Sequence, residues 1–146
     1  MTVKEILSRK GTSVISTTPE RSIKHAIATL VGQGVGALLV MNEAEEVVGI
    51  ITERDILRAS ASTFDNLGGL TVGDLMSRDV IIGCEDDTIG YVEQIMTENR
   101  IRHLPIYSGK RLAGIISIGD VVKAAAHQAA GEVKHLTSYI TDKYPA

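Results

Sequence analysis

The 146-residue sequence has few of the residues on which several kinds of site depend. Its single cysteine, Cys84, rules out an internal disulfide, which suits a reducing compartment. It has no tryptophan, and aromatic residues make up 3% of the chain, so little is available to stack on nucleic-acid bases. The net charge of −3 points the same way, because broad binding to nucleic acid or to anionic membranes requires a basic surface.

Long hydrophobic runs are also missing. The N-terminal segment Met1–Glu5 carries an acidic residue and lacks the apolar run of a signal peptide. No stretch approaches the roughly 18 apolar residues of a membrane-spanning helix, and the longest runs, such as Val35–Met41, have the length of a strand. These features predict a soluble, cytoplasmic protein without a membrane or nucleic-acid partner.

A catalytic or metal-binding set is not apparent either. Cys84 is followed by three acidic residues, which do not suit a nucleophilic thiolate, and the four histidines lack zinc-ligand spacing. The glycines of Gly32–Gly36 have G-x-G-x-G spacing and follow a helix pattern, unlike the dinucleotide-binding fingerprint. His103 and Asp120 could form an acid–base pair, but no nucleophile or metal ligand accompanies them. We therefore expect no enzymatic activity and no catalytic cofactor.

The main feature that is present is an internal repeat. Gly49–Asp55 reads GIITERD and reappears as Gly114–Asp120, which reads GIISIGD. Upstream, Thr2–Leu7 matches Thr71–Met76 at nearly the same spacing. Several ordered matches at an almost constant spacing indicate a duplication.

Both repeats show the same succession of hydrophobicity patterns. In the first repeat we expect a short helix at Val3–Leu7, a brief β-branched run at Val14–Ile15 and a helix from Ile23. Two strands follow at Ala37–Met41 and Val47–Ile51, and a further helix begins at Thr52. The second predicts the same elements at Val72–Met76, Val80–Ile82, from Ile89, Leu104–Tyr107, Leu112–Ile116 and from Ser117. This α-β-α-β-β-α order is typical of an α/β fold, with Ser22 and Thr88 placed to cap helices. We expect repeats at 1–61 and 71–141 and a polar, glycine-rich linker at 62–70.

The last helix is expected to be longer than its counterpart in the first repeat. From Val121 the pattern continues past Gly131 toward Ile140, rich in alanine and with one apolar stripe. Such a stripe requires a covering surface, either within the chain or on a second chain, so the helix folds back or supports a homodimer.

These repeats resemble a tandem pair of cystathionine-β-synthase (CBS) domains, also called a Bateman module. The resemblance covers about residues 1–141 and rests on the two G-h-h-[ST]-x-x-D segments, supported by Gly34–Leu38 and Ile101–Ile106. It implies two α/β repeats packed through their sheets as a pseudo-two-fold pair. It also implies clefts for adenosine-type nucleotides and a regulatory, non-enzymatic function.

The resemblance implies that Thr52 and Asp55 bind a ribose in one cleft, and that Ser117 and Asp120 do so in the other. A carboxylate can accept hydrogen bonds from a ribose diol, and a helix N-terminus favours phosphate. The same S/T-x-x-D pattern is also that of a capping box, in which both side chains bind only backbone. The sequence leaves both interpretations open.

Basic residues supply the candidates for phosphate contacts, although they could also form a solvated edge. The complete set of expected ligand-binding residues is Val35, Gly36, Ala37, Thr52, Arg54, Asp55, Arg100, Ile101, Arg102, His103, Ser117 and Asp120. Arg100 and Arg102 stand where the first repeat has Gly34 and Gly36, so the two clefts should not be equivalent. The expected ligand is AMP, ATP or an NAD-type nucleotide, and one expected outcome is AMP in one cleft and a larger dinucleotide such as NAD in the other.

Two functions follow from these observations. The first is a sensor in which an adenine nucleotide shifts the packing of the repeats, and the new state is recognised by a partner protein. The second is a structural interaction module without a physiological ligand. The sequence identifies neither the ligand nor the effector protein.

Overall fold

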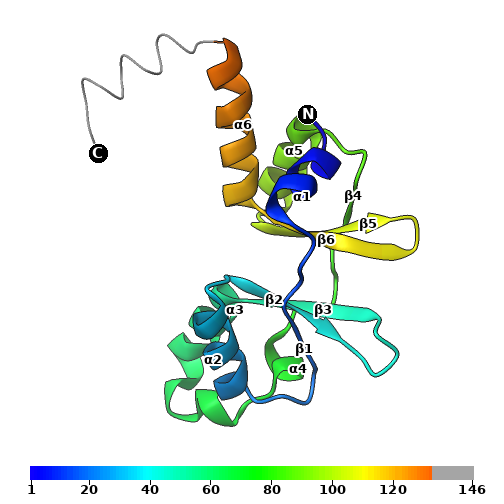
Figure 1. Cartoon of the computed structure of the whole chain (residues 1–146). Coiled ribbons are helices and arrows are strands. Elements are labelled where there is room, and N and C mark those ends of the chain that lie inside the picture. The colour runs from blue at the N-terminus through cyan, green and yellow to red at the C-terminus, as the bar shows by residue number, and fades with distance from the viewer. Residues whose placement is uncertain (133–146) are drawn as a thin grey trace, which may run out of the picture. The chain divides into compact units, whose positions relative to one another are not determined.

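The computed structural model describes residues 1–132 and contains two compact units that are built alike (Figure 1). The middle unit comprises residues 13–81. The split unit combines residues 1–12 with the described residues from 82 to 132. The expected continuation of the last helix toward Ile140 lies outside the described residues.

The middle unit has a three-stranded sheet in the order β1-β2-β3, with β1 parallel to β2 and β2 antiparallel to β3. Its elements are β1 (Ser16–Thr17), α2 (Ile23–Gln33), β2 (Ala37–Met41), β3 (Val47–Thr52), α3 (Glu53–Thr63), the 3₁₀ helix η1 (Phe64–Gly69) and α4 (Val72–Leu75). Its core is apolar and includes the fully buried side chains of Ile23, Leu38, Ile51 and Val72.

The split unit repeats this arrangement, with the order β4-β5-β6 and the same strand directions. Its elements are α1 (Val3–Lys10), β4 (Gly83–Cys84), α5 (Ile89–Asn99), β5 (His103–Ser108), β6 (Arg111–Ser117) and α6 (Ile118–Glu132). Two three-stranded sheets with helices confirm the predicted α/β fold. Within residues 1–132, no helix combines the length and the apolar character needed to cross a membrane.

The central helix of each unit begins at the predicted cap. The Ser22 hydroxyl accepts the backbone N–H of His25 at 3.1 Å, and the Thr88 hydroxyl accepts that of Tyr91 at 3.2 Å. Each bond satisfies a donor that has no partner inside the first helical turn. The helices then bury one face, as the 3.6-residue spacing predicted: Ile23, Ala26 and Leu30 in α2, and Ile89, Val92 and Met96 in α5.

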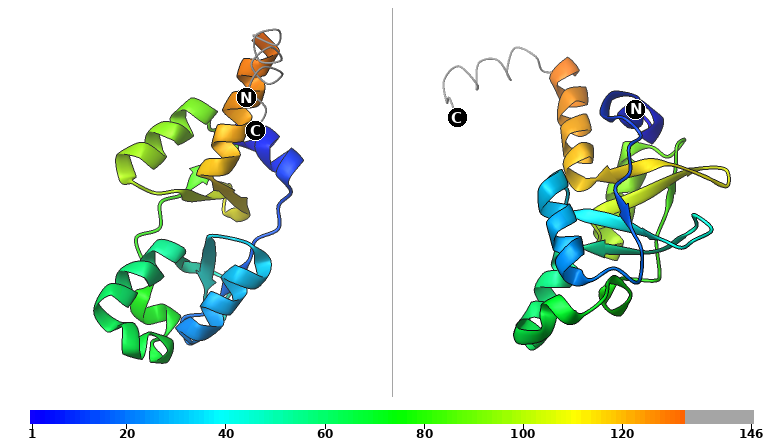
Figure 2. Two further views of the ribbon diagram at one scale, coloured as in Figure 1. Left: turned by 90° about the vertical axis from the view of Figure 1, so that its left-hand side faces the viewer. Right: turned by 60° about the horizontal axis from the view of Figure 1, so that its bottom comes forward.

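The opening helix of each repeat packs on the sheet of the other repeat. Helix α1 buries Leu7 against β6, where a Cβ at Gly114 would lie 2.9 Å from the Leu7 side chain. Helix α1 also lies beside α6, which can be seen in both Figure 1 and Figure 2. Conversely, Val72 of α4 is fully buried in the middle unit, and its N–H donates to the Arg21 carbonyl at 2.8 Å. The compact units are therefore not the same divisions of the chain as the sequence repeats expected at 1–61 and 71–141, because each unit takes its opening helix from the other repeat.

The segment expected to be a linker, residues 62–70, is folded. Helix α3 continues to Thr63, and η1 follows directly. Leu67 and Leu70 pack against the core of the middle unit, and the Leu70 carbonyl accepts the N–H of Ile23 at 2.8 Å. The two leucines anchor this short 3₁₀ helix, so the segment between the two repeats has a structure of its own.

Both short strands begin later than predicted. The β-branched runs Val14–Ile15 and Val80–Ile82 precede β1 and β4 instead of forming them. The pairing with β2 involves Ser16 and Thr17, while the Ile15 carbonyl still accepts a hydrogen bond from Leu39 at 3.2 Å. The β-branched residues therefore lie just before each short strand, and the less apolar residues that follow form the strand pairing.

Candidate ligand-binding sites

In the middle unit, the predicted ribose motif lies where β3 ends and α3 begins. Thr52 is the last residue of β3 and the N-cap of α3. Its hydroxyl accepts the backbone N–H of Asp55 at 3.3 Å, and Asp55 Oδ2 accepts the Thr52 N–H at 2.9 Å and hydroxyl at 3.1 Å. These contacts form a capping box, so the capping interpretation of this pair is correct.

The split unit builds the same arrangement at the junction of β6 and α6. Asp120 Oδ2 accepts the backbone N–H of Ser117 at 2.8 Å and its hydroxyl at 3.1 Å. The Ser117 hydroxyl in turn accepts the N–H of Asp120 at 3.2 Å. The duplication seen in the sequence therefore extends to individual hydrogen bonds.

Capping uses only one oxygen of each carboxylate. All the hydrogen bonds to Asp55 and Asp120 converge on Oδ2, so within residues 1–132 the Oδ1 atoms accept none. Both residues are half-buried. A carboxylate has about four lone-pair sites, so each Oδ1 remains available to a donor from a ligand. Capping and ligand binding are thus compatible at the same residue.

A third pair shows that the motif alone does not make a site. Thr71 and Asp74 form another complete capping box, at the start of the four-residue helix α4. Asp74 is exposed, and the hydrogen bond from the Thr71 backbone, followed by that from its side chain, lowers the pKa of this carboxyl below its ordinary value. Of these three pairs, those at the β3–α3 and β6–α6 junctions lie beside the start of a strand.

That neighbouring strand start brings further predicted residues to each pair. Ala37 is the pairing partner of Thr52, and the N–H of Glu53 donates to the Gly36 carbonyl at 3.0 Å. In the split unit His103 pairs with Ser117, and the N–H of Ile118 donates to the Arg102 carbonyl at 2.8 Å. In each unit, the predicted strand residues therefore lie beside the S/T-x-x-D pair of the same repeat.

A groove is lined by Glu53 and Ile56, the sequence neighbours of Thr52 and Asp55, and not by that pair itself. Its volume is about 540 Å³, and it is lined by Ile27, Leu30, Val31, Gly34, Val35, Gly36, Glu53 and Ile56. Val35 and Gly36 were predicted as site residues, whereas the contribution of α2 was not. A signal for it exists, because Val31 lies on the apolar stripe of this helix and yet is 77% exposed.

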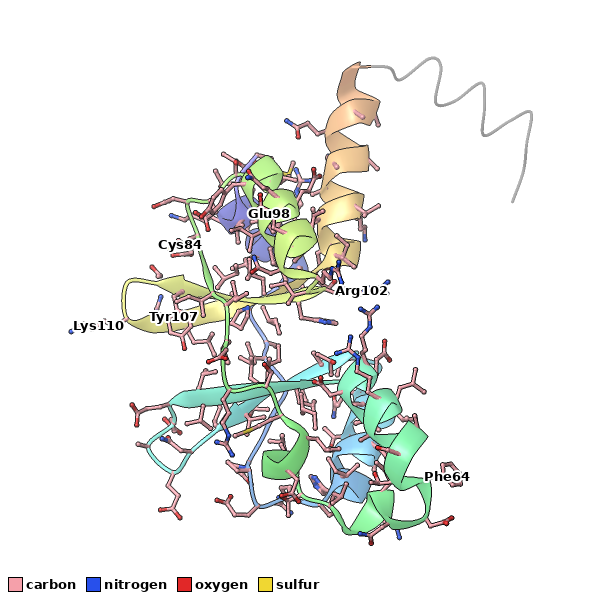
Figure 3. All side chains as sticks on the ribbon, turned by 180° about the vertical axis from the view of Figure 1, so that it is seen from behind. Phe64, Cys84, Glu98, Arg102, Tyr107 and Lys110 are labelled. Atoms are coloured by element: carbon pink, nitrogen blue, oxygen red, sulfur yellow. The ribbon has the colours of Figure 1, made fainter. Side chains whose placement is uncertain are left out.

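The predicted basic residues are spread over the helix ends and the sheet edge. Arg54 is exposed in the first turn of α3, and Arg100 is exposed at the end of α5. Arg102 is exposed beside the start of α6, at the end of the sheet remote from Lys110 in the β5–β6 turn (Figure 3). His103 is half-buried as the first residue of β5, and so is Ile101, whose N–H donates to the Met96 carbonyl at 3.0 Å.

Arg100 has a backbone conformation that favours glycine. It ends α5 with φ of 54°, and its counterpart Gly34 ends α2 with φ of 66°. A side chain in this left-handed region costs on the order of 1 kcal/mol, because Cβ approaches the following carbonyl oxygen. An arginine at this position therefore has a conformational cost that the first repeat avoids.

Replacing Arg100 with glycine should consequently stabilise the protein by about 1 kcal/mol while removing one candidate phosphate contact. Urea unfolding measures the first effect, and titration with AMP measures the second. The matched control is Gly34→Ala, which meets no atom within 4 Å and should lose about 1 kcal/mol from backbone strain alone. A destabilised Arg100→Gly variant would contradict the assigned strain.

Sequence reasoning missed Lys10, the last residue of α1. Its Nζ donates to Asp120 Oδ2 at 2.6 Å and to the Ile115 carbonyl at 2.8 Å. Burial acts to raise the pKa of Asp120, but the hydrogen bond from Lys10, the backbone hydrogen bond from Ser117 and the Lys10 charge together lower it below its ordinary value. The contact exists only because α1 packs on the sheet of the other repeat.

A duplicated α/β unit with one S/T-x-x-D site at each strand–helix junction defines a class of tandem-repeat modules. Comparison with known families places the chain within that class. The CBS domain matches it twice, over residues 3–62 and 72–127. The chain belongs to the CBS-domain family.

Solved structures agree with this assignment. The CBS-domain containing protein ATU1752 from Agrobacterium tumefaciens is 40% identical, with 86% of this chain and 99% of that chain covered and a TM-score of 0.84. The CBS domain pair of MJ0100, in complex with 5-methylthioadenosine and S-adenosyl-L-methionine, is 27% identical over 88% of this chain and 98% of that chain, with a TM-score of 0.72. CBSX2 in complex with AMP is 26% identical over the same two shares, with a TM-score of 0.70.

Proposed function

We propose that this protein is a regulatory module that binds an adenosine compound, with Asp55 and Asp120 accepting hydrogen bonds from ribose hydroxyls. The observation that carries the proposal is the state of the two carboxylates. Each uses Oδ2 for the helix cap and has Oδ1 available, on a half-buried side chain at a helix start. A hydrogen bond from a hydroxyl to an ionised carboxylate is about twice as strong as a neutral one.

The groove of the middle unit supports a purine as the remaining part of the ligand. Its volume of about 540 Å³ falls within the roughly 300–1,000 Å³ of small-molecule sites. The lining is mainly aliphatic, from Ile27, Leu30, Val35 and Ile56, and it includes Gly34 and Gly36. Aliphatic side chains can cover the faces of a purine, and glycine backbone allows its polar edge to approach.

Related structures support an adenosine compound as the ligand class. Complexes of CBS pairs with AMP, 5-methylthioadenosine and S-adenosyl-L-methionine share an adenosine group and differ in what is attached to the ribose. We extend that shared group to this chain, with AMP or an adenine dinucleotide such as NAD as the candidates. The start of α3 or α6, together with Arg54, Arg100, Arg102 and His103, would then serve the phosphates.

The output of such a module is a change in assembly or in its contacts with another protein. A ligand shifts a conformational equilibrium only by its different affinities for the two states, so binding must be coupled to a change in the structure. Val31 and Leu57 in the middle unit and Val122 on α6 are large apolar side chains that are at least 60% exposed. We propose a cytoplasmic homodimer that acts on an effector protein.

The direct test is to denature the purified protein and to identify any released small molecule by mass spectrometry, followed by titration with AMP. Asp55→Ala and Asp120→Ala should each weaken binding at their own site about tenfold or more, because the ribose acceptor is lost. The matched control is Asp74→Ala, which removes an equivalent capping carboxylate outside both sites and should leave AMP binding unchanged. No released adenosine compound and no thermal shift with millimolar adenine nucleotides would favour an interaction module instead.

A further inference from the structure

The two proposed ribose carboxylates differ in whether a cation pairs with them. Lys10 of α1 pairs with Asp120 at 2.6 Å, so the carboxylate and the ammonium cancel at the split-unit site. In the part of the chain that the structure describes, Asp55 has no such cation. The repeat explains the difference: Thr2–Lys10 aligns with Thr71–Asp79, and the residue that corresponds to Lys10 is Asp79, of opposite charge.

The pairing of Lys10 is held by two contacts. Besides Asp120 Oδ2, Nζ donates to the Ile115 carbonyl on β6 at 2.8 Å, so the ammonium bridges the last strand and the last helix of the unit. The Lys10 side chain is 33% exposed and that of Asp120 is 22% exposed. An ion pair in this environment is screened less than one on the open surface, so the ammonium offsets the repulsion between the Asp120 carboxylate and a phosphate bound next to it.

We propose that Lys10 is a specificity-determining residue that makes the Ser117–Asp120 site prefer phosphorylated adenosine compounds over neutral nucleosides. An ammonium attracts a phosphate, and its pairing with Asp120 reduces the attraction of that carboxylate for uncharged hydroxyl donors. The Thr52–Asp55 site, whose carboxylate has no paired lysine within residues 1–132, should prefer neutral nucleosides over phosphorylated adenosine compounds. This inference rests on the proposed function, because it concerns which adenosine compound one of the proposed sites selects.

Calorimetric titration with AMP and with adenosine tests this preference in a chain whose middle-unit site is silenced by Asp55→Asn. Lys10→Met should lower the ratio of the dissociation constants for adenosine and AMP about fivefold, since AMP binds more weakly and adenosine more tightly. Lys10→Arg should restore the ratio. The matched control is Arg9→Met, which removes the neighbouring exposed charge on α1 and should leave the ratio unchanged.

A purely structural role for Lys10 would change the affinities for both ligands in the same direction, so an unchanged ratio in Lys10→Met would overturn this inference and leave the proposed function standing. AMP binding that is present in the unmodified chain and lost in Asp55→Asn would also overturn it, because the split-unit site would then hold no nucleotide. If neither ligand bound the unmodified chain, the proposed function and this inference would fall together.

Discussion

Leu7→Ala should destabilise the split unit by about 3 kcal/mol, although Leu7 belongs to the first repeat of the sequence. The Leu7 side chain is 3% exposed and packs on β6 next to Gly114. Truncation removes buried methyl groups and leaves a cavity that a short helix on a sheet cannot close. Met76→Ala is the reciprocal change, because Met76 corresponds to Leu7 in the repeat and lies in the core of the middle unit.

Hydrogen exchange followed by mass spectrometry distinguishes the two units. In Leu7→Ala, amides of α5 should lose protection while those of α2 keep it, and Met76→Ala should give the reverse pattern. The exchange of opening helices between the repeats is therefore open to a direct test. Loss of protection confined to α2 in Leu7→Ala, or equal losses in both units, would contradict the assignment of α1 to the split unit.

Much of the fold could be predicted because the relevant signals are local. The Ser22 and Thr88 caps, the apolar face of each central helix and the antiparallel strand pairs depend on residues close together in the sequence. Duplication strengthened each of these signals, since a pattern that occurs twice in the same order is unlikely to arise by chance. The S/T-x-x-D pairs were found in the same way.

What could not be predicted depends on contacts between distant segments. The apolar face of α1 indicates that a sheet covers this helix. Gly49 and Gly114 occupy equivalent positions in the two sheets, so the sequence does not indicate which sheet that is. The Lys10–Asp120 pair follows from that choice and was missed for the same reason. The ambiguity between cap and ligand site had a different cause, because it depended on how individual carboxylate oxygens are used.

Gly49→Ala should cost about 3 kcal/mol, and Gly114→Ala only about 1 kcal/mol, although the two glycines are equivalent in the repeat. A Cβ at Gly49 would lie 2.7 Å from the Met76 sulfur and 2.9 Å from the Ser77 carbonyl oxygen. That carbonyl cannot retreat easily, because Ser77 exchanges two backbone hydrogen bonds with Ile50, at 2.9 and 3.0 Å. At Gly114 the nearest atoms are the methyl ends of Leu7, which a change of rotamer can move away.

Urea unfolding of both variants measures this difference. Gly32→Ala controls for the substitution itself, since Gly32 lies on the exposed side of α2 with nothing within 4 Å of its Cβ position. There alanine should stabilise the helix by about 1 kcal/mol. Equal costs at Gly49 and Gly114 would contradict the distinction between a backbone and a side-chain obstacle. A larger cost at Gly49 would show that the Ser77 main chain, held by its pairing with Ile50, cannot move aside as the Leu7 side chain can.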